Sequence, residues 1–224
     1  DANDLGASLD LQKDGLGFVD LDFTEFRRHY DGTGGLHRRF TALQANETDK
    51  RLALDIGRLG LTTGLALEGW PALTLRYERE FKDGAKSRLT WTPVKDDGET
   101  RSIGPSWQDV EEIVDTFELR ATHELAGFAL SGEQRWEFVR AESLREERSL
   151  STTTTASDRK IRRQDQAPEA TLMTTTLGTE RRFWEDRLFL AAGYHFAHMN
   201  NREFESLLEF NVQGVPTSFS NPKQ

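Results

Sequence analysis

The chain has no cysteine and no long apolar run, and each absence excludes a class of protein. Without cysteine, disulfides, thiolate metal sites, thiol nucleophiles and covalently attached c-type haem are ruled out. No segment approaches the ~18 consecutive apolar residues of a membrane-spanning helix. Hydrophobic residues make up 36% of the chain and charged residues 30%, so a conventional two-layer core would be difficult to fill.

A basic surface is also missing. The formal net charge is −9, and acidic and basic residues are interleaved along the chain rather than gathered into blocks. Nucleic-acid binding proteins need a basic face to contact phosphates. The composition therefore excludes a nucleic-acid partner.

What the sequence does contain is strict alternation of apolar and charged residues in paired segments. The clearest pair is Phe117 to Leu125 and Phe128 to Phe138. Strands of soluble domains are usually ~5–6 residues long, whereas membrane-spanning strands need ~9–11 residues that are apolar toward lipid and polar toward a lumen. The pattern predicts an all-β fold: an antiparallel up-and-down transmembrane β-barrel in a bacterial outer membrane, or an open section of a larger one.

About nine segments follow this pattern, within a range of roughly 8–10 strands. Very short turns join some of them, near Gly69, Gly127 and Glu185, and long polar loops are expected at 95–112 and 141–170. Barrels of this class have short turns on one side and long loops on the other. The expected strands cover residues 18–30, 51–67, 72–81, 87–94, 117–125, 128–138, 171–183, 188–198 and 203–212.

The pattern also predicts where the barrel begins and ends. Residues 1–16 are expected to be irregular, 17–213 to form strands and loops, and 214–224 to form a loop or tail. An odd strand count, the lack of a terminal aromatic residue and a start at Asp1 rather than Met favour a section of a longer protein.

Two local features are predicted as well. Lys82, Asp83 and Gly84 are expected to turn the chain between two strands. In residues 51–67 the apolar parity switches, from Leu54 and its neighbours to Leu59 and those that follow, which predicts a β-bulge near Gly57.

One stretch carries a family resemblance. Residues 26–35 read FRRHYDGTGG, and residues 72–91 read ALTLRYEREFKDGAKSRLTW. These segments resemble the large MtrB/PioB-like outer-membrane barrels, the porin components of porin–cytochrome electron conduits. The resemblance implies a fragment of a longer barrel that could enclose a periplasmic multihaem cytochrome, and it implies no catalytic residue and no cofactor bound by this chain.

Alternation assigns side chains to two environments. Charged residues of one parity are candidates for lining a polar lumen, where rings of charge set selectivity; cross-strand pairing on a solvated sheet would produce the same pattern. The lumen candidates are Arg76, Glu78, Glu80, Glu118, Arg120, Glu124, Glu133, Arg135, Glu137, Glu180 and Arg182. The lipid-facing candidates are Leu73, Leu75, Tyr77, Phe117, Leu119, Phe128, Leu130, Trp136, Phe138, Leu188, Leu190 and Tyr194.

Catalytic and metal sites are not expected. His195 and His198 are spaced so that a strand would place them on opposite faces. The same argument separates His123 from Ser131, whereas a nucleophile and its base must lie within hydrogen-bond reach. The basic run from Arg159 to Arg163 is expected in a solvated loop, where it could also meet lipopolysaccharide phosphates.

A competing interpretation is a soluble β-rich or α+β binding module. Residues 106–117 carry a capping-box pattern and an apolar helical stripe, and residues 135–150 are rich in helix formers. Strand alternation through Glu124 and Glu133 argues against helices there. The expected function is a porin-like channel or scaffold in contact with outer-membrane lipid; the alternatives are a sheath for a cytochrome and the soluble module.

Overall fold

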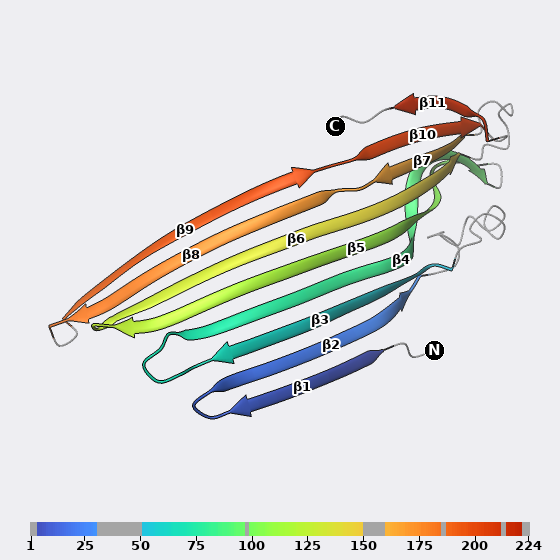
Figure 1. Ribbon diagram of the computed structural model, residues 1–224. Coiled ribbons are helices and arrows are strands. Elements are labelled where there is room, and N and C mark those ends of the chain that lie inside the picture. Colours follow the sequence, from blue (N-terminus) through green and yellow to red (C-terminus); the bar gives the residue numbers. More distant parts are fainter. Residues whose placement is uncertain are drawn as a thin grey trace.

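The computed structural model shows an all-β chain whose strands form one antiparallel, up-and-down sheet (Figure 1). None of the residues it describes is helical. Residues 106–117 and 135–149 are strand, so the helical alternative for these segments is wrong. The structure describes residues 4–30, 51–96, 99–149, 160–184, 187–211 and 214–220.

Eleven strands follow one another among the described residues. They are β1 (Leu5–Lys13), β2 (Gly17–His29), β3 (Ala53–Leu65), β4 (Ala72–Asp96), β5 (Glu99–Leu125), β6 (Phe128–Ser149), β7 (Lys160–Gln166), β8 (Glu169–Phe183), β9 (Leu188–Arg202), β10 (Glu205–Asn211) and β11 (Pro216–Ser220). Each of β1 to β6 pairs with the next strand in sequence. The up-and-down connectivity predicted from the sequence is confirmed.

Two strands of the sheet are interrupted at the same level, so that β7 and β8 form one broken strand and β9 and β10 form the next. β6 pairs with β8 in its first half and with β7 in its second. On the other side, β9 pairs with β8 and β10 pairs with β7. Pro168, which has no backbone N–H, lies in the first interruption. Ala141 N donates to Pro168 O (3.1 Å) and Ala167 N to Phe204 O (2.8 Å). The breaks are thus bridged, and eight strands (β1 to β6, β8 and β9) cross the half of the sheet that carries the short turns.

Two residues separate Asp96 of β4 from Glu99 of β5 at one end of the sheet, and four further short connections, here called the short turns, lie together at the opposite end (Figure 1). Residues 14–16, 66–71, 126–127 and 184–187 make them. In the β5–β6 connection Ala126 and Gly127 have φ of 51° and 76°, and two positive φ values characterise the type I′ turns that match strand twist in hairpins. Glu185, placed in a turn by the sequence, lies outside the described residues, as do the expected loop residues 36–50.

The strand registers place alternate residues on two faces. Tyr77, Phe117 and Trp136 lie in one row across β4, β5 and β6, while Arg76, Glu118 and Arg135 lie in the next. We call the side of the sheet that carries Phe117 face A and the side that carries Glu118 face B. The predicted separation of apolar and charged side chains is therefore confirmed for these strands.

Polarity changes along the strands at one row of face A, here called the border row. It consists of Phe23, Leu59, Arg79, Asp115, Phe138, Thr171 and Asn200, paired strand to strand. Between this row and the short turns face A is apolar; beyond it face A carries Glu25, Arg27 and Asp55, while Leu54 and Ile56 point to face B.

This inversion explains the parity switch in β3 without a bulge. The β2–β3 and β3–β4 registers run continuously through Gly57, so the predicted bulge is wrong. The apolar residues change face because the environment changes along the strand, not because the backbone slips.

The predicted loop at 95–112 and the turn at 82–84 are also wrong. β4 and β5 span 25 and 27 residues and pair from Ala72 to Asp96, with one register shift between Trp91 and Val94. Gly84 has φ 128° and an added Cβ would lie 2.2 Å from Ala53 O, so glycine here serves a close backbone approach within a strand, where β4 bends out of the sheet plane (Figure 1). Cross-strand ion pairs such as Lys82–Glu112 (2.5 Å) hold segments that lack apolar alternation.

Three other boundaries need correction. The segment 1–16 contains β1, the tail 214–224 contains β11, and the expected loop 141–170 contains the end of β6 and all of β7. Within the basic run, Arg162 pairs with Glu209 (3.0 Å) and Arg163 with Glu146 (3.2 Å). These polar segments were assigned to loops because pairing between charged side chains leaves no apolar period in the sequence.

The buried core is small. Among the described residues the buried hydrophobic side chains are Leu52, Leu54, Ala85 and Trp107. All lie beyond the border row, where Tyr30 and Leu144 pack against Leu52, Ala85 and Trp107. The half of the sheet with the short turns has no second layer among these residues, so both of its faces are uncovered there.

Candidate functional site

The two predicted sets of side chains lie on opposite faces of the sheet. All eleven lumen candidates have the parity of face B, and all twelve lipid-facing candidates have the parity of face A. The sequence therefore sorted these residues correctly by face. Their assignment to lumen and to lipid remains a prediction.

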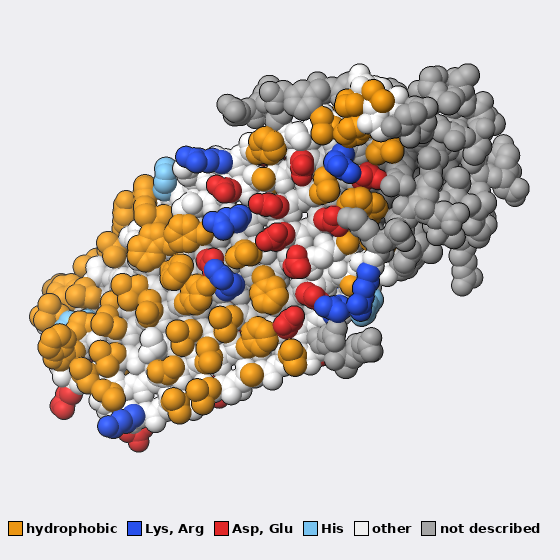
Figure 2. All heavy atoms as spheres, turned by 45° about the vertical axis from the view of Figure 1, so that its right-hand side comes forward, with side chains coloured by type: hydrophobic (Ala, Val, Ile, Leu, Met, Phe, Trp, Pro, Cys, Tyr) orange, Lys and Arg blue, Asp and Glu red, His pale blue; other side chains and the backbone are white. Residues whose placement is uncertain are grey.

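Face A carries an exposed apolar band between the border row and the short turns (Figure 2). Leu75, Leu119, Phe138 and Leu190 in this band are 47, 43, 44 and 54% exposed. Eight strands spaced ~4.8 Å apart and a nine-residue run rising ~3.3 Å per residue give the band an area of roughly 900 Å². Monomeric soluble proteins rarely expose contiguous apolar patches larger than a few hundred Å².

Three polar side chains inside the apolar band, those of Gln134, Thr175 and Thr63, have internal hydrogen-bond partners. Gln134 Nε2 donates to Thr174 O (3.1 Å), and Thr175 Oγ1 donates to Gln134 Oε1 (2.6 Å). Thr63 Oγ1 donates to Phe18 O (3.0 Å). A polar group placed in an apolar solvent costs free energy unless it is hydrogen-bonded, so these residues suit an apolar environment despite their polarity.

The border row is marked by an ion pair and a phenol. Arg79 Nε donates to Asp115 Oδ1 at 2.7 Å, and Tyr77 OH donates to the same carboxylate oxygen at 2.7 Å. Tyr77 has its ring among the apolar side chains, 4.8 Å from Phe117 between centroids. An aromatic ring with its hydroxyl directed to charged groups is typical of a boundary between apolar and aqueous surroundings.

Beyond the border row, face A carries a second carboxylate–guanidinium pair. Arg27 donates to Asp55 with two nitrogens, one of them Nη2 to Oδ2 at 2.6 Å. The hydrogen bonds from Arg27 lower the pKa of Asp55 below its ordinary value, although partial burial acts against this. The pair joins β2 to β3 and keeps that carboxylate charged at neutral pH.

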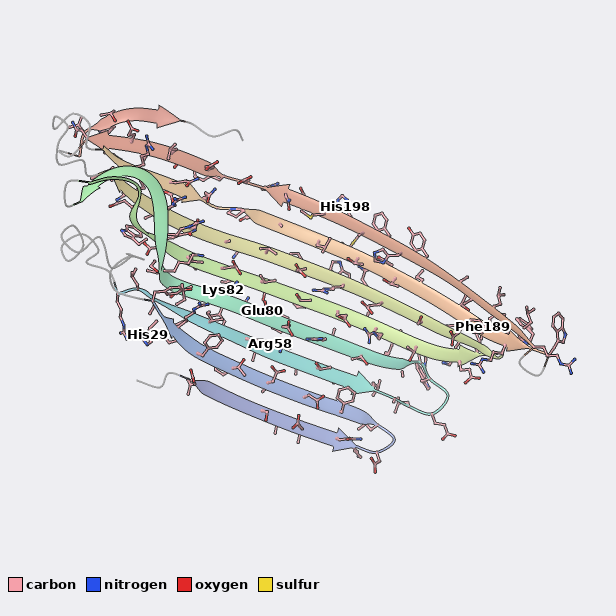
Figure 3. All side chains as sticks on the ribbon, turned by 180° about the vertical axis from the view of Figure 1, so that it is seen from behind. His29, Arg58, Glu80, Lys82, Phe189 and His198 are labelled. Carbon is pink, nitrogen blue, oxygen red and sulfur yellow. The ribbon has the colours of Figure 1, made fainter. Side chains whose placement is uncertain are left out.

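Face B carries a network of paired charges across β3 to β6. Arg58 and Arg76 both reach Glu78, at 2.5 and 2.6 Å. Arg120 pairs with Glu118 (3.2 Å) and Glu133 (2.8 Å). Arg135 pairs with Glu137 (2.6 Å). Figure 3, which shows the sheet from behind, labels Arg58, Glu80 and Lys82 of β3 and β4.

The network is electrically balanced. Four arginines, Arg58, Arg76, Arg120 and Arg135, contact four glutamates. Such pairs on a solvated sheet face contribute little stability, about 0.2–1 kcal/mol each. Glu124 and Glu180 share this face and have no ion pair with another described residue. With Asp20 and Asp22 of β2 they outnumber Arg182, which lies on the same face, so the surplus charge of this part of face B is negative.

The described residues show no arrangement suited to binding a metal. No three of their His, Asp or Glu side chains gather closely enough to hold an ion. His195 lies on face B and His198 on face A, and His123 and Ser131 are likewise on opposite faces, as predicted. In this part of the chain no helix is long and apolar enough to cross a membrane.

Comparisons with known protein families, curated proteins and solved structures found no match. The resemblance of residues 26–91 to MtrB/PioB-like barrels remains a prediction. The observations that bear on function are therefore the apolar band of face A and the charge network of face B.

Sequence reasoning missed several residues at the edges of the apolar band. The Arg79–Asp115 and Arg27–Asp55 pairs were missed because alternation does not give the register between strands, and Asp115 also lay outside the expected strands. Arg181 was also missed, since only its neighbour Arg182 was named as a candidate, for face B. Its signal was present: Arg181 shares parity with Leu177 and Phe183 of face A.

Proposed function

We propose that this chain is part of the wall of a porin-like outer-membrane channel or scaffold, with face A against lipid and face B toward a water-filled lumen. The observation that carries the proposal is the contrast between neighbouring residues of the same strand. Ala121 and Leu119 belong to the exposed apolar band, while Arg120 between them belongs to the balanced charge network. A membrane barrel requires this contrast over ~9–11 residues per strand.

The height of the band supports this assignment. From Leu125 to Phe117, β5 presents only Leu, Ala, His and Phe to face A, and Asp115 follows in the border row. The ten residue steps from Leu125 to Asp115, at ~3.4 Å each and with the strand tilted by ~40°, rise about 26 Å along the membrane normal. This height is close to the ~25 Å apolar belt of outer-membrane barrels. The remaining length of β4, β5 and β6 then extends beyond the membrane on the side away from the short turns.

The soluble alternative fits less well. A soluble sheet of this width would have to cover roughly 900 Å² of apolar surface. No described segment lies over the band in Figure 2. The internal pairing of Gln134 and Thr175 would also bring little advantage in water, whereas in lipid it removes a large desolvation cost.

A cysteine-accessibility experiment tests the proposal directly, because the natural chain has no cysteine. Ala121→Cys and Thr122→Cys place one thiol on each face of the same strand. In proteoliposomes we expect a membrane-impermeant maleimide to label Thr122→Cys and to leave Ala121→Cys unlabelled until detergent is added. Equal labelling of both variants before detergent is added would contradict a lipid-facing face A.

A stability measurement provides a second, independent test. Leu119→Arg is expected to lower the free energy of unfolding in phospholipid vesicles by about 2–4 kcal/mol, since the site lies in the middle of the band. The matched variant Thr122→Arg, on face B of the same strand, is expected to change it by less than about 1 kcal/mol. Urea titration followed by tryptophan fluorescence measures both. Similar losses of unfolding free energy in the two variants would indicate that both faces contact water, and would contradict the proposal.

A further inference from the structure

Arg181 is an exception within the apolar band. Apart from Lys13 at the end of the edge strand β1, it is the only Lys, Arg, Asp or Glu among the described residues of β1 to β9 that lie on face A between the border row and the short turns. It makes no ion pair or hydrogen bond with another described residue. Arg79 and Arg27, which lie on face A at or beyond the border row, both hold carboxylates.

From this exception we propose that Arg181 binds the phosphate of a glycerophospholipid at the short-turn rim of the apolar band. The inference rests on the proposed membrane location of face A. It adds a specific lipid-binding residue to a surface that would otherwise contact lipid only through apolar side chains.

The guanidinium group makes cation–π contacts with two aromatic rings. Arg181 Cζ lies 4.6 Å from the ring centroid of Phe128 and 4.6 Å from that of Phe183. A Cβ added at Gly127 would lie 3.6 Å from Arg181 Nε, so the group also passes close to the β5–β6 turn. Cation–π contacts limit the motion of a guanidinium and leave the N–H donors that do not face the rings available.

The missing acceptor is best supplied by a phosphate. Arginine forms two parallel, charge-assisted hydrogen bonds with a phosphate group. A guanidinium in an apolar setting without an acceptor carries a desolvation cost that such a partner removes. Because the flanking rings already limit its motion, Arg181 has little conformational freedom to lose on binding.

The depth of Arg181 fits a lipid headgroup. It lies two residues before the end of β8 at Phe183, where the cost of a lipid-facing arginine is small, whereas at the middle of a bilayer it is large. Trp184 and Trp70, at two of the short turns, are 73 and 72% exposed, and tryptophan is enriched at the membrane–water interface. Leu125 and Leu190, in the same row as Arg181, are 58 and 54% exposed and provide contacts for acyl chains.

Native mass spectrometry of the full chain in maltoside micelles, titrated with phosphatidylglycerol, tests the site. The wild-type chain is expected to bind one phosphatidylglycerol more tightly than all others. Arg181→Leu is expected to weaken that binding about tenfold or more, the effect of losing charge-assisted hydrogen bonds. Arg181→Lys, which keeps the charge but loses the planar fork, should lie between the two. Arg182→Leu, which removes the same charge from face B, should bind as the wild type does.

Several results would overturn the site. One is unchanged phosphatidylglycerol affinity in Arg181→Leu; another is displacement of the bound lipid by inorganic phosphate, which would make the ligand a free anion. If Arg181→Leu fails to fold, Arg181→Gln removes the charge, keeps a polar side chain and gives the same comparison. The labelling of Ala121→Cys and Thr122→Cys reports membrane insertion separately. Loss of lipid selectivity with that labelling intact therefore affects this site alone, and reversed labelling affects the proposed function.

Discussion

At the residue scale, the turn between β5 and β6 places an alanine in the left-handed region of backbone conformation. Ala126 has φ 51°, which costs a residue with a Cβ about 1–2 kcal/mol. Ala126→Gly is expected to raise the free energy of unfolding by about 0.5–1 kcal/mol after the extra entropy of the unfolded glycine is counted. Urea titration in detergent measures this. Ala129→Gly, within β6, is the control and should be destabilising; a loss of stability in both would contradict the turn geometry.

A second residue-scale prediction concerns the ring that covers Gly57. Phe81 lies opposite this glycine, and a Cβ there would lie 2.1 Å from Phe81 Cζ. Gly57→Ala is therefore expected to destabilise the sheet by about 1–3 kcal/mol, the usual cost of overpacking. Gly6→Ala, where an added Cβ meets nothing within 4 Å, should have little effect. If Phe81→Leu does not reduce the cost of Gly57→Ala, the ring is not its cause.

At the scale of the element, β2 and β3 are joined beyond the border row by Arg27 and Asp55. Because the pKa of Asp55 is lowered in the folded state, its contribution to stability is present above the ordinary aspartate pKa of ~3.9 and is lost as the pH falls through the folded value. Asp55→Asn should thus be less stable than the wild type at pH 7, and the difference should disappear in strong acid.

The measurement for this pair is a double-mutant cycle with Arg27→Gln and Asp55→Asn, followed by urea titration from pH 7 to pH 2. The coupling free energy is expected to stay constant down to about pH 5 and then to decline. A coupling that grows as the pH falls would contradict the ion pair. The cycle removes contributions from groups that titrate independently.

At the scale of the whole molecule, the open sheet has long unpaired edges. Among the described strands, β9 pairs with β8 alone and β1 with β2 alone. Unpaired backbone groups exposed to lipid cost several kcal/mol each, so a membrane-embedded form needs further strands at these edges. β1 and β9 run in opposite directions, which suits antiparallel closure with an even strand count.

Hydrogen exchange tests this expectation. For the chain in detergent, we expect peptides from residues 188–202 to exchange faster than those from 117–125, because β5 is hydrogen-bonded on both sides and β9 on one. In the assembled membrane form the two regions should be equally protected. Fast exchange of 188–202 that persists in the bilayer would show that the edge stays free, and would contradict a closed wall.

The sequence by itself determined the features that follow from side-chain alternation. Strand type, the two faces and the turns near Gly69 and Gly127 could be predicted because one face must be apolar and the other polar over the band. Beyond the border row that constraint ends, and the prediction failed there: β4, β5 and β6 continue through polar segments held by pairs such as Lys82–Glu112.

Only the tertiary structure decided which residues meet across strands. The inversion of polarity in β3, the balance of Arg120 against Glu118 and Glu133, and the contacts of Arg181 with the rings of Phe128 and Phe183 all depend on register. Alternation has a period of two, so it assigns each residue to a face but leaves the alignment of neighbouring strands open to shifts by even numbers of residues. Pairing partners become definite only when the whole sheet is assembled.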